Sequence, residues 1–175
     1  MTDRPALVHL RGAGEPEPTA AHALLSQRFR VIVLEAGEPA STPDSLVRAI
    51  DRLGLETFNL LAGAAASRTA LGVALQVPER VTALVLEAPT AISEERRVGE
   101  LATPTLVLYG TLDPVTPAVG RRIATLMRNC HLVFVYAAGP TIGIDRPEAF
   151  AEVVGDFLER HEAFVIRRTA TVIHP

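Results

Sequence analysis

Short apolar runs rich in β-branched residues recur along this chain, and segments with helical patterns lie between them. The runs span Ala6 to Leu10, Arg30 to Ala36, Thr57 to Ala62, Val81 to Ala88, Thr105 to Gly110 and Leu132 to Ala137. Strands that alternate with helices form right-handed βαβ units, and such units build a parallel sheet. The sequence therefore predicts an α/β fold with a mostly parallel central sheet of about six strands, flanked by helices.

The chain length fits one folded unit with an additional tail. We expect residues 1–175 to form a single domain, because 175 residues can bury one substantial core. Residues 163–175 follow the last predicted helix and are rich in valine, isoleucine and threonine, which predicts an extra C-terminal strand or an ordered arm. An exposed apolar strand invites pairing, so this arm or a sheet edge could join chains into a homo- or hetero-oligomer, for example a dimer.

Composition excludes several kinds of function. Cys130 is the only cysteine and lysine is absent, which excludes an internal disulfide, a cysteine metal cage and Schiff-base chemistry. The net charge of −3 argues against a nucleic-acid surface. The five histidines lack the spacing of metal ligands, so we expect no metal and no cofactor.

The chain also lacks the usual signals for a membrane. No apolar run approaches the ~18 residues that a spanning helix needs. The first residues, Met1 to Ala6, show no basic segment followed by a long apolar one, so no signal peptide is visible. We therefore expect a cytoplasmic protein without a membrane segment.

The stretch LLAGAAASRTALGVALQVPERVTALVLEAP, residues 60 to 89, has an unusual turn. It predicts a strand, a tight turn of very small side chains, a helix and a second strand. Nothing in the turn itself can attack a substrate, coordinate a metal or carry charge.

Several phrases, in order, resemble the α/β-hydrolase family. They are PALVHLRGAG, RFRVIVLEAG, the stretch around residues 60 to 89, TPTLVLYGTLDPVTP and HLVFVYAAGPTIGIDRPEAFAEVVGDFLE. The resemblance extends to about Glu159. It implies the α/β-hydrolase fold, in a version with a short connection between Ala88 and Thr105 where family members commonly insert a lid. A lidless member should have a shallow, open pocket.

The family's catalytic positions can be assigned through this resemblance. The nucleophile stands in the middle of Gly-x-Ser-x-Gly, which matches residues 62 to 66 and places Ala64 there. The histidine should follow Ala-Gly after the last parallel strand, where this chain has Pro140. Asp113 matches the acid. The triad is thus degenerate, since neither alanine nor proline can attack or accept a proton.

The family's oxyanion loop is retained mainly in its backbone. Many members read His-Gly where this chain reads Arg11-Gly12. Backbone N–H groups from this loop and from Ala65 could converge on an anion, with Arg11 adding a charged fork. We expect Arg11, Gly12 and Ala65 to bind a small anionic ligand; the alternative for Arg11 is a solvated surface side chain.

Other polar residues have structural interpretations. We expect Ser67, at the start of the helix after the turn, to satisfy a free backbone N–H group rather than act as a displaced nucleophile. His9 is expected to be a core or loop-supporting histidine. The strand RVIVLEA should lie near a sheet edge, which the C-terminal arm could cover.

Three functions follow from these observations. The first is a pseudoenzyme that acts by binding, as a partner subunit, scaffold or small-ligand receptor. The second is a hydrolase of esters or thioesters with non-standard residues, such as Asp113 activating water or Ser67 used out of place. The third is a purely structural dimerisation protein.

Overall fold

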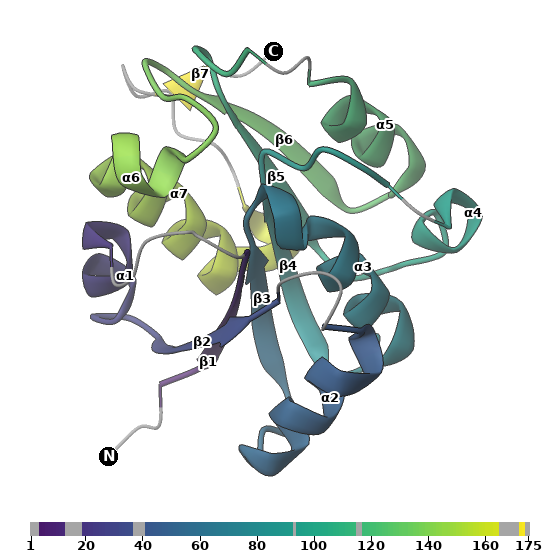
Figure 1. Cartoon of the computed structure of the whole chain (residues 1–175). Coiled ribbons are helices and arrows are strands. Elements are labelled where there is room, and N and C mark those ends of the chain that lie inside the picture. Colours follow the sequence, from purple (N-terminus) through teal and green to yellow (C-terminus); the bar gives the residue numbers. More distant parts are fainter. Residues whose placement is uncertain are drawn as a thin grey trace.

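Seven strands form one sheet in the computed structural model, in the order β2-β1-β3-β4-β5-β6-β7 (Figure 1). The structure describes residues 4–12, 19–36, 41–92, 94–114, 117–164 and 172–173. The strands are β1 (Ala6–Arg11), β2 (Arg30–Glu35), β3 (Phe58–Ala62), β4 (Val81–Glu87), β5 (Thr105–Gly110), β6 (Cys130–Val135) and β7 (Val172–Ile173). All neighbouring pairs from β2 to β6 are parallel, and β7 is antiparallel to β6. The predicted α/β sheet is confirmed.

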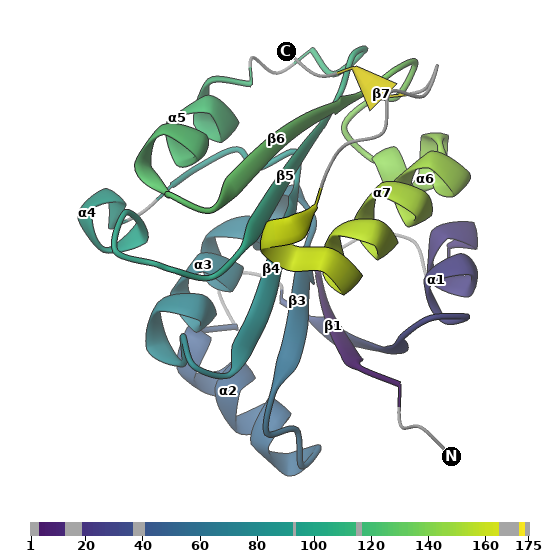
Figure 2. The ribbon, with the colours of Figure 1, turned by 180° about the vertical axis from the view of Figure 1, so that it is seen from behind.

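Helices cover both faces of the sheet (Figures 1 and 2). They are α1 (Ala20–Leu25), α2 (Pro43–Arg52), η1 (Ala64–Ala66), α3 (Ser67–Gln76), α4 (Glu95–Val98), α5 (Ala118–Leu126), α6 (Ile142–Asp145), α7 (Pro147–Arg160) and η2 (His161–Ala163). Helices α2 to α5 pack on one face, and α1, α6 and α7 pack on the other. None of the described helices is long and apolar enough to cross a membrane.

Alternating strand residues supply the two cores. Leu60 packs with the core under α2 to α5, whereas its neighbour Leu61 packs with the core under α1, α6 and α7. Successive strand residues point to opposite faces, so a strand covered on both sides must be apolar throughout. This explains the continuous apolar runs that predicted the strands.

The two sheet edges are occupied differently. Strand β2 is an edge strand, as predicted for RVIVLEA. In the tail, β7 confirms the extra strand, but it pairs with β6 at the opposite edge, Ile173 facing Phe134 and Val172 facing Val135. The described part of the tail therefore does not cover β2. The rest of the predicted arm, 165–171 and 174–175, lies outside the described residues.

A buried tyrosine joins three segments on the α5 side. Tyr109, 1% exposed, donates its hydroxyl to the carbonyl oxygen of Pro89 at 2.7 Å and accepts the N–H group of Gly120 at 3.1 Å. Tyr109→Phe leaves both backbone groups buried and unsatisfied, so we expect the free energy of unfolding to fall by about 1–3 kcal/mol in urea titrations. Tyr136→Phe is the matched control, because that side chain is 56% exposed, and should change it by less than about 0.5 kcal/mol. Equal effects of both variants would contradict the role given to Tyr109.

Candidate functional site

The turn of small residues joins β3 to α3, as predicted. Strand β3 ends at Ala62, and the short helix η1 then leads directly into α3. The carboxyl ends of β1, β3 and β4 meet at this edge of the parallel sheet, which is where open α/β sheets bind ligands. The side chains of this turn are small, and Ala64 carries no reactive group.

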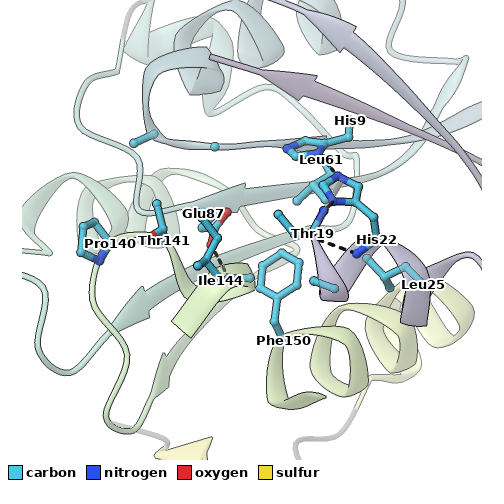
Figure 3. Close-up of a pocket in the computed structure, with 14 residues that line it drawn as sticks. His9, Thr19, His22, Leu25, Leu61, Glu87, Pro140, Thr141, Ile144 and Phe150 are labelled. Atoms are coloured by element: carbon cyan, nitrogen blue, oxygen red, sulfur yellow. Dashed lines mark hydrogen bonds between the residues drawn. The ribbon is translucent and has the colours of Figure 1, made fainter. Parts of the chain in front are cut away.

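A cavity of about 90 Å³ lies beside this turn (Figure 3). Its walls come from the ends of β1, β3 and β4, from α1, and from the segment that contains α6 and the start of α7. The lining residues are His9, Thr19, Ala21, His22, Leu25, Leu61, Gly63, Ala64, Glu87, Pro140, Thr141, Gly143, Ile144 and Phe150. The structure thus brings the predicted positions Ala64 and Pro140 to one cavity.

Three polar side chains form a hydrogen-bonded row on one wall. His9 Nδ1 lies 2.7 Å from His22 Nε2, and His22 Nδ1 lies 2.7 Å from the Thr19 hydroxyl oxygen. The backbone N–H of Thr19 also donates to His22 Nδ1 at 3.1 Å. Thr19 is the N-cap of α1, and its capping box with His22 fixes the second imidazole against the first.

His9 is held neutral. It is 7% exposed, and burial lowers its pKa from 6.5 to about 3, with smaller electrostatic contributions from His22 and Arg11. Its Nε2 atom is buried and has no hydrogen-bond partner among the described residues. The burial of His9 agrees with the expectation of a core or loop-supporting histidine, and the residue also reaches the cavity.

Glu87 brings a carboxyl group to the same cavity. It is the last residue of β4, and its Oε1 accepts the backbone N–H of Gly143 at 2.9 Å. Figure 3 shows Glu87 and His9 reaching the cavity from two different strands. The cavity therefore contains a neutral imidazole and a carboxyl group, and either can take part in proton transfer or hydrogen bonding.

Four residues proposed from the sequence do not line this cavity as the structure describes it: Arg11, Gly12, Ala65 and Asp113. Arg11 forms an ion pair with Glu35, with 2.6 Å between Nη2 and Oε1. Asp113 follows β5, where its N–H group donates to the carbonyl of Gly110 at 3.2 Å. A role of these residues in ligand binding stays a prediction.

Ala65 lies on the other side of the turn. It lines a second hollow together with Ala64, Arg68, Thr90 and Ala91. The predicted oxyanion position and the cavity beside His9 are therefore separate places, although Ala64 borders both.

Ser67 cannot act as a displaced nucleophile. It is fully buried, and its hydroxyl donates to the carbonyl oxygen of Gly63 at 2.9 Å. The expectation that it would cap a free N–H group is wrong, because the hydroxyl bonds to the carbonyl four residues earlier, as serine often does inside helices.

The loop at Pro140 is braced by an acidic side chain. Asp145 Oδ2 accepts the backbone N–H of Gly139 at 2.7 Å, which closes a tight loop between β6 and α6. This contact joins the residue before Pro140 to the end of α6.

The residues do not suggest a metal centre. Among the described residues, no group of three or more histidine, cysteine, aspartate or glutamate side chains could hold an ion. Burial also raises the pKa of the Cys130 thiol to about 12, so this cysteine is not a thiolate at neutral pH.

Sequence reasoning missed Thr19, His22 and Glu87. Glu87 ends a long apolar run at the carboxyl edge of the predicted sheet, and that position was the available signal. Thr19 and His22 have the spacing of an N-cap and its third helical residue. Nothing in the sequence indicated that α1 would place His22 against His9.

Comparisons with known proteins agree with the architecture. No family model matches the chain, and no curated protein matches its sequence. A predicted CIB-like hydrolase from Thermoplasma acidophilum matches with a TM-score of 0.76 and 16% identity, over 90% of this chain and 87% of that one. An α/β-hydrolase enzyme from the metagenome of lagoon sediments at Mar Chica, Morocco, has a TM-score of 0.77 and 19% identity, over 90% and 92%. Naproxen esterase from Bacillus subtilis has a TM-score of 0.77 and 14% identity, over 90% and 85%. The chain has the α/β-hydrolase fold.

Proposed function

We propose that this protein hydrolyses small esters or thioesters without a covalent acyl-enzyme. The observation that supports the proposal is the presence of Glu87 in the cavity beside the turn, where Ala64 supplies no nucleophile. A carboxylate can activate water directly as a general base.

The reaction balances with water as the only co-reactant. Glu87 accepts a proton as the water oxygen bonds to the carbonyl carbon. The tetrahedral intermediate then collapses, and the bond between its central carbon and the leaving oxygen (in an ester) or sulfur (in a thioester) breaks. The leaving group takes the proton from Glu87. The products are a carboxylic acid and an alcohol or thiol, and Glu87 is restored.

The cavity favours short substrates. Its volume of about 90 Å³ is well below the roughly 300–1,000 Å³ of typical ligand pockets. We propose that the short connection between β4 and β5 leaves the protein without a separate lid, so that an alcohol or thiol group projects into solvent while a short acyl chain is enclosed.

Glu87→Gln tests the proposed base. We expect the variant to lower the rate of hydrolysis of aryl acetates, aryl butyrates and their thioesters by about 10²–10⁴-fold, because glutamine cannot accept the proton. Glutamine keeps a carbonyl oxygen for the Gly143 N–H group, so the loop should hold its position.

Asp113→Asn is the matched comparison, because it removes the carboxylate that the family resemblance assigns. Asp113 lies outside the described cavity lining, so the rate should stay within about twofold of wild type. If Asp113→Asn abolished hydrolysis and Glu87→Gln did not, the proposal would be refuted. Asp113, the acid assigned by the family resemblance, would then be the base.

Binding without turnover is the second candidate. Ala64 and Pro140 favour it, because both line the cavity and neither supplies a nucleophile or a base. Such a partner subunit, scaffold or receptor would bind a small ligand and release it unchanged. Assembly through a sheet edge or the tail stays a separate prediction, which light scattering would test.

A further inference from the structure

His9 lines the cavity, and one of its buried polar atoms has no hydrogen bond from any residue that the structure describes. His9 Nε2 has no partner among the described residues, and the side chain is 7% exposed. Buried polar atoms in native proteins are nearly always hydrogen-bonded, so this atom of a cavity-lining residue is a candidate contact for a molecule bound in the cavity.

The hydrogen bonds among Thr19, His22 and His9 determine which ring nitrogen of His9 carries the proton. The backbone N–H of Thr19 can only donate, so His22 Nδ1 accepts and carries no proton. A neutral His22 then carries its proton on Nε2 and donates it to His9 Nδ1. His9 Nδ1 is an acceptor, and a neutral His9 therefore has its proton on Nε2.

We infer that His9 is a fixed, uncharged hydrogen-bond donor that binds the carbonyl oxygen of a neutral ligand such as an ester, thioester or ketone. The inference rests on the proposed function in that the ligand occupies this cavity. It does not require the ligand to be hydrolysed.

Glu87 restricts the ligand class further. A carboxylate ligand would bring a second negative charge beside the carboxylate of Glu87, and His9 has no positive charge to compensate it. A neutral carbonyl meets no such repulsion. The cavity should therefore accept an ester and release the acid formed from it.

The tautomer can be measured in the unmodified protein. Long-range ¹H–¹⁵N correlation spectra distinguish the two nitrogens of each imidazole. At about pH 7, where His9 is neutral, we expect His9 to carry its proton on Nε2. We expect His22, whose Nδ1 accepts the Thr19 N–H group, to carry its proton on Nε2 as well. A proton on His9 Nδ1 would overturn the inference.

The ligand class is tested with 2-butanone and butyrate as probes. We expect 2-butanone to shift the His9 Nε2 resonance and to bind at least about tenfold more tightly than butyrate, because of the charge of Glu87. Tighter binding of butyrate than of 2-butanone, or no shift of the His9 Nε2 resonance with 2-butanone, would overturn the inference.

Two variants test the row that holds His9. His22→Phe keeps an aromatic ring but removes the donor to His9 Nδ1, and should weaken 2-butanone binding about two- to tenfold. His22→Gln keeps an N–H donor and should restore most of the affinity. Equal affinity in both variants and wild type would contradict a positioning role of His22.

The two proposals fail separately. If 2-butanone binds at His9 but no ester is hydrolysed, the proposed function is wrong and the inference stands. If esters are hydrolysed with Glu87 as base but 2-butanone does not reach His9, the inference is wrong and the proposed function stands.

Discussion

Gly110→Ala is expected to lower the free energy of unfolding by about 3 kcal/mol or more, because it overpacks backbone against backbone. Gly110 is the last residue of β5, and a Cβ atom there would overlap the carbonyl oxygens of Ala138 and Gly139. Those atoms cannot rotate away as a side chain could. The same loop leads to Pro140, so the variant should also disturb the cavity.

Gly143→Ala is the matched control. A Cβ atom at Gly143 would meet Ala21 Cβ at 3.5 Å, an ordinary van der Waals distance. We expect urea titrations to show a change below about 1 kcal/mol for this variant. If Gly110→Ala were as stable as Gly143→Ala, the loop after β6 could not lie against β5 in the way described.

The second large effect concerns pH and His9. In the unfolded chain this imidazole takes up a proton near pH 6.5, whereas in the folded protein its pKa is lowered to about 3. The stability that the protein gains by keeping His9 neutral is therefore fully present above pH 6.5. Between these values the unfolded state binds a proton that the folded state does not, so stability should fall by about 1.4 kcal/mol for each pH unit below 6.5.

His9→Gln separates this contribution from that of other groups. Glutamine cannot be protonated in this range but keeps a carbonyl oxygen that can accept from His22. We expect urea titrations at pH 7 and pH 4.5 to show a loss of stability that is about 2–3 kcal/mol larger in wild type than in His9→Gln. Parallel losses in the two proteins would show that His9 is not buried in its neutral form.

Much of the fold could be predicted because its strands are apolar on both faces. Nearly continuous apolar runs such as Val81 to Ala88 indicate strands that are buried on both faces. The alternation of these strands with helices indicates a parallel sheet. The position of the tail strand could not be predicted. β-branched residues favour a strand, but they do not determine whether it pairs with β2 or with β6.

The site was only partly predictable. The resemblance located the turn at Ala64 and the loop at Pro140, since both depend on local backbone shape. It could not reveal the contact between His9 and His22, which lie on different elements and meet only through the packing of α1 beside β1. Glu87 was missed because a polar residue that ends a strand more often marks the start of a loop.

Diffraction from crystals of the protein soaked with 2-butanone would test most directly whether ligands bind in the cavity between His9 and Glu87. We expect the carbonyl oxygen of the probe about 2.7–3.2 Å from His9 Nε2. A probe bound instead beside Arg11, or in the hollow lined by Ala65 and Arg68, would contradict it.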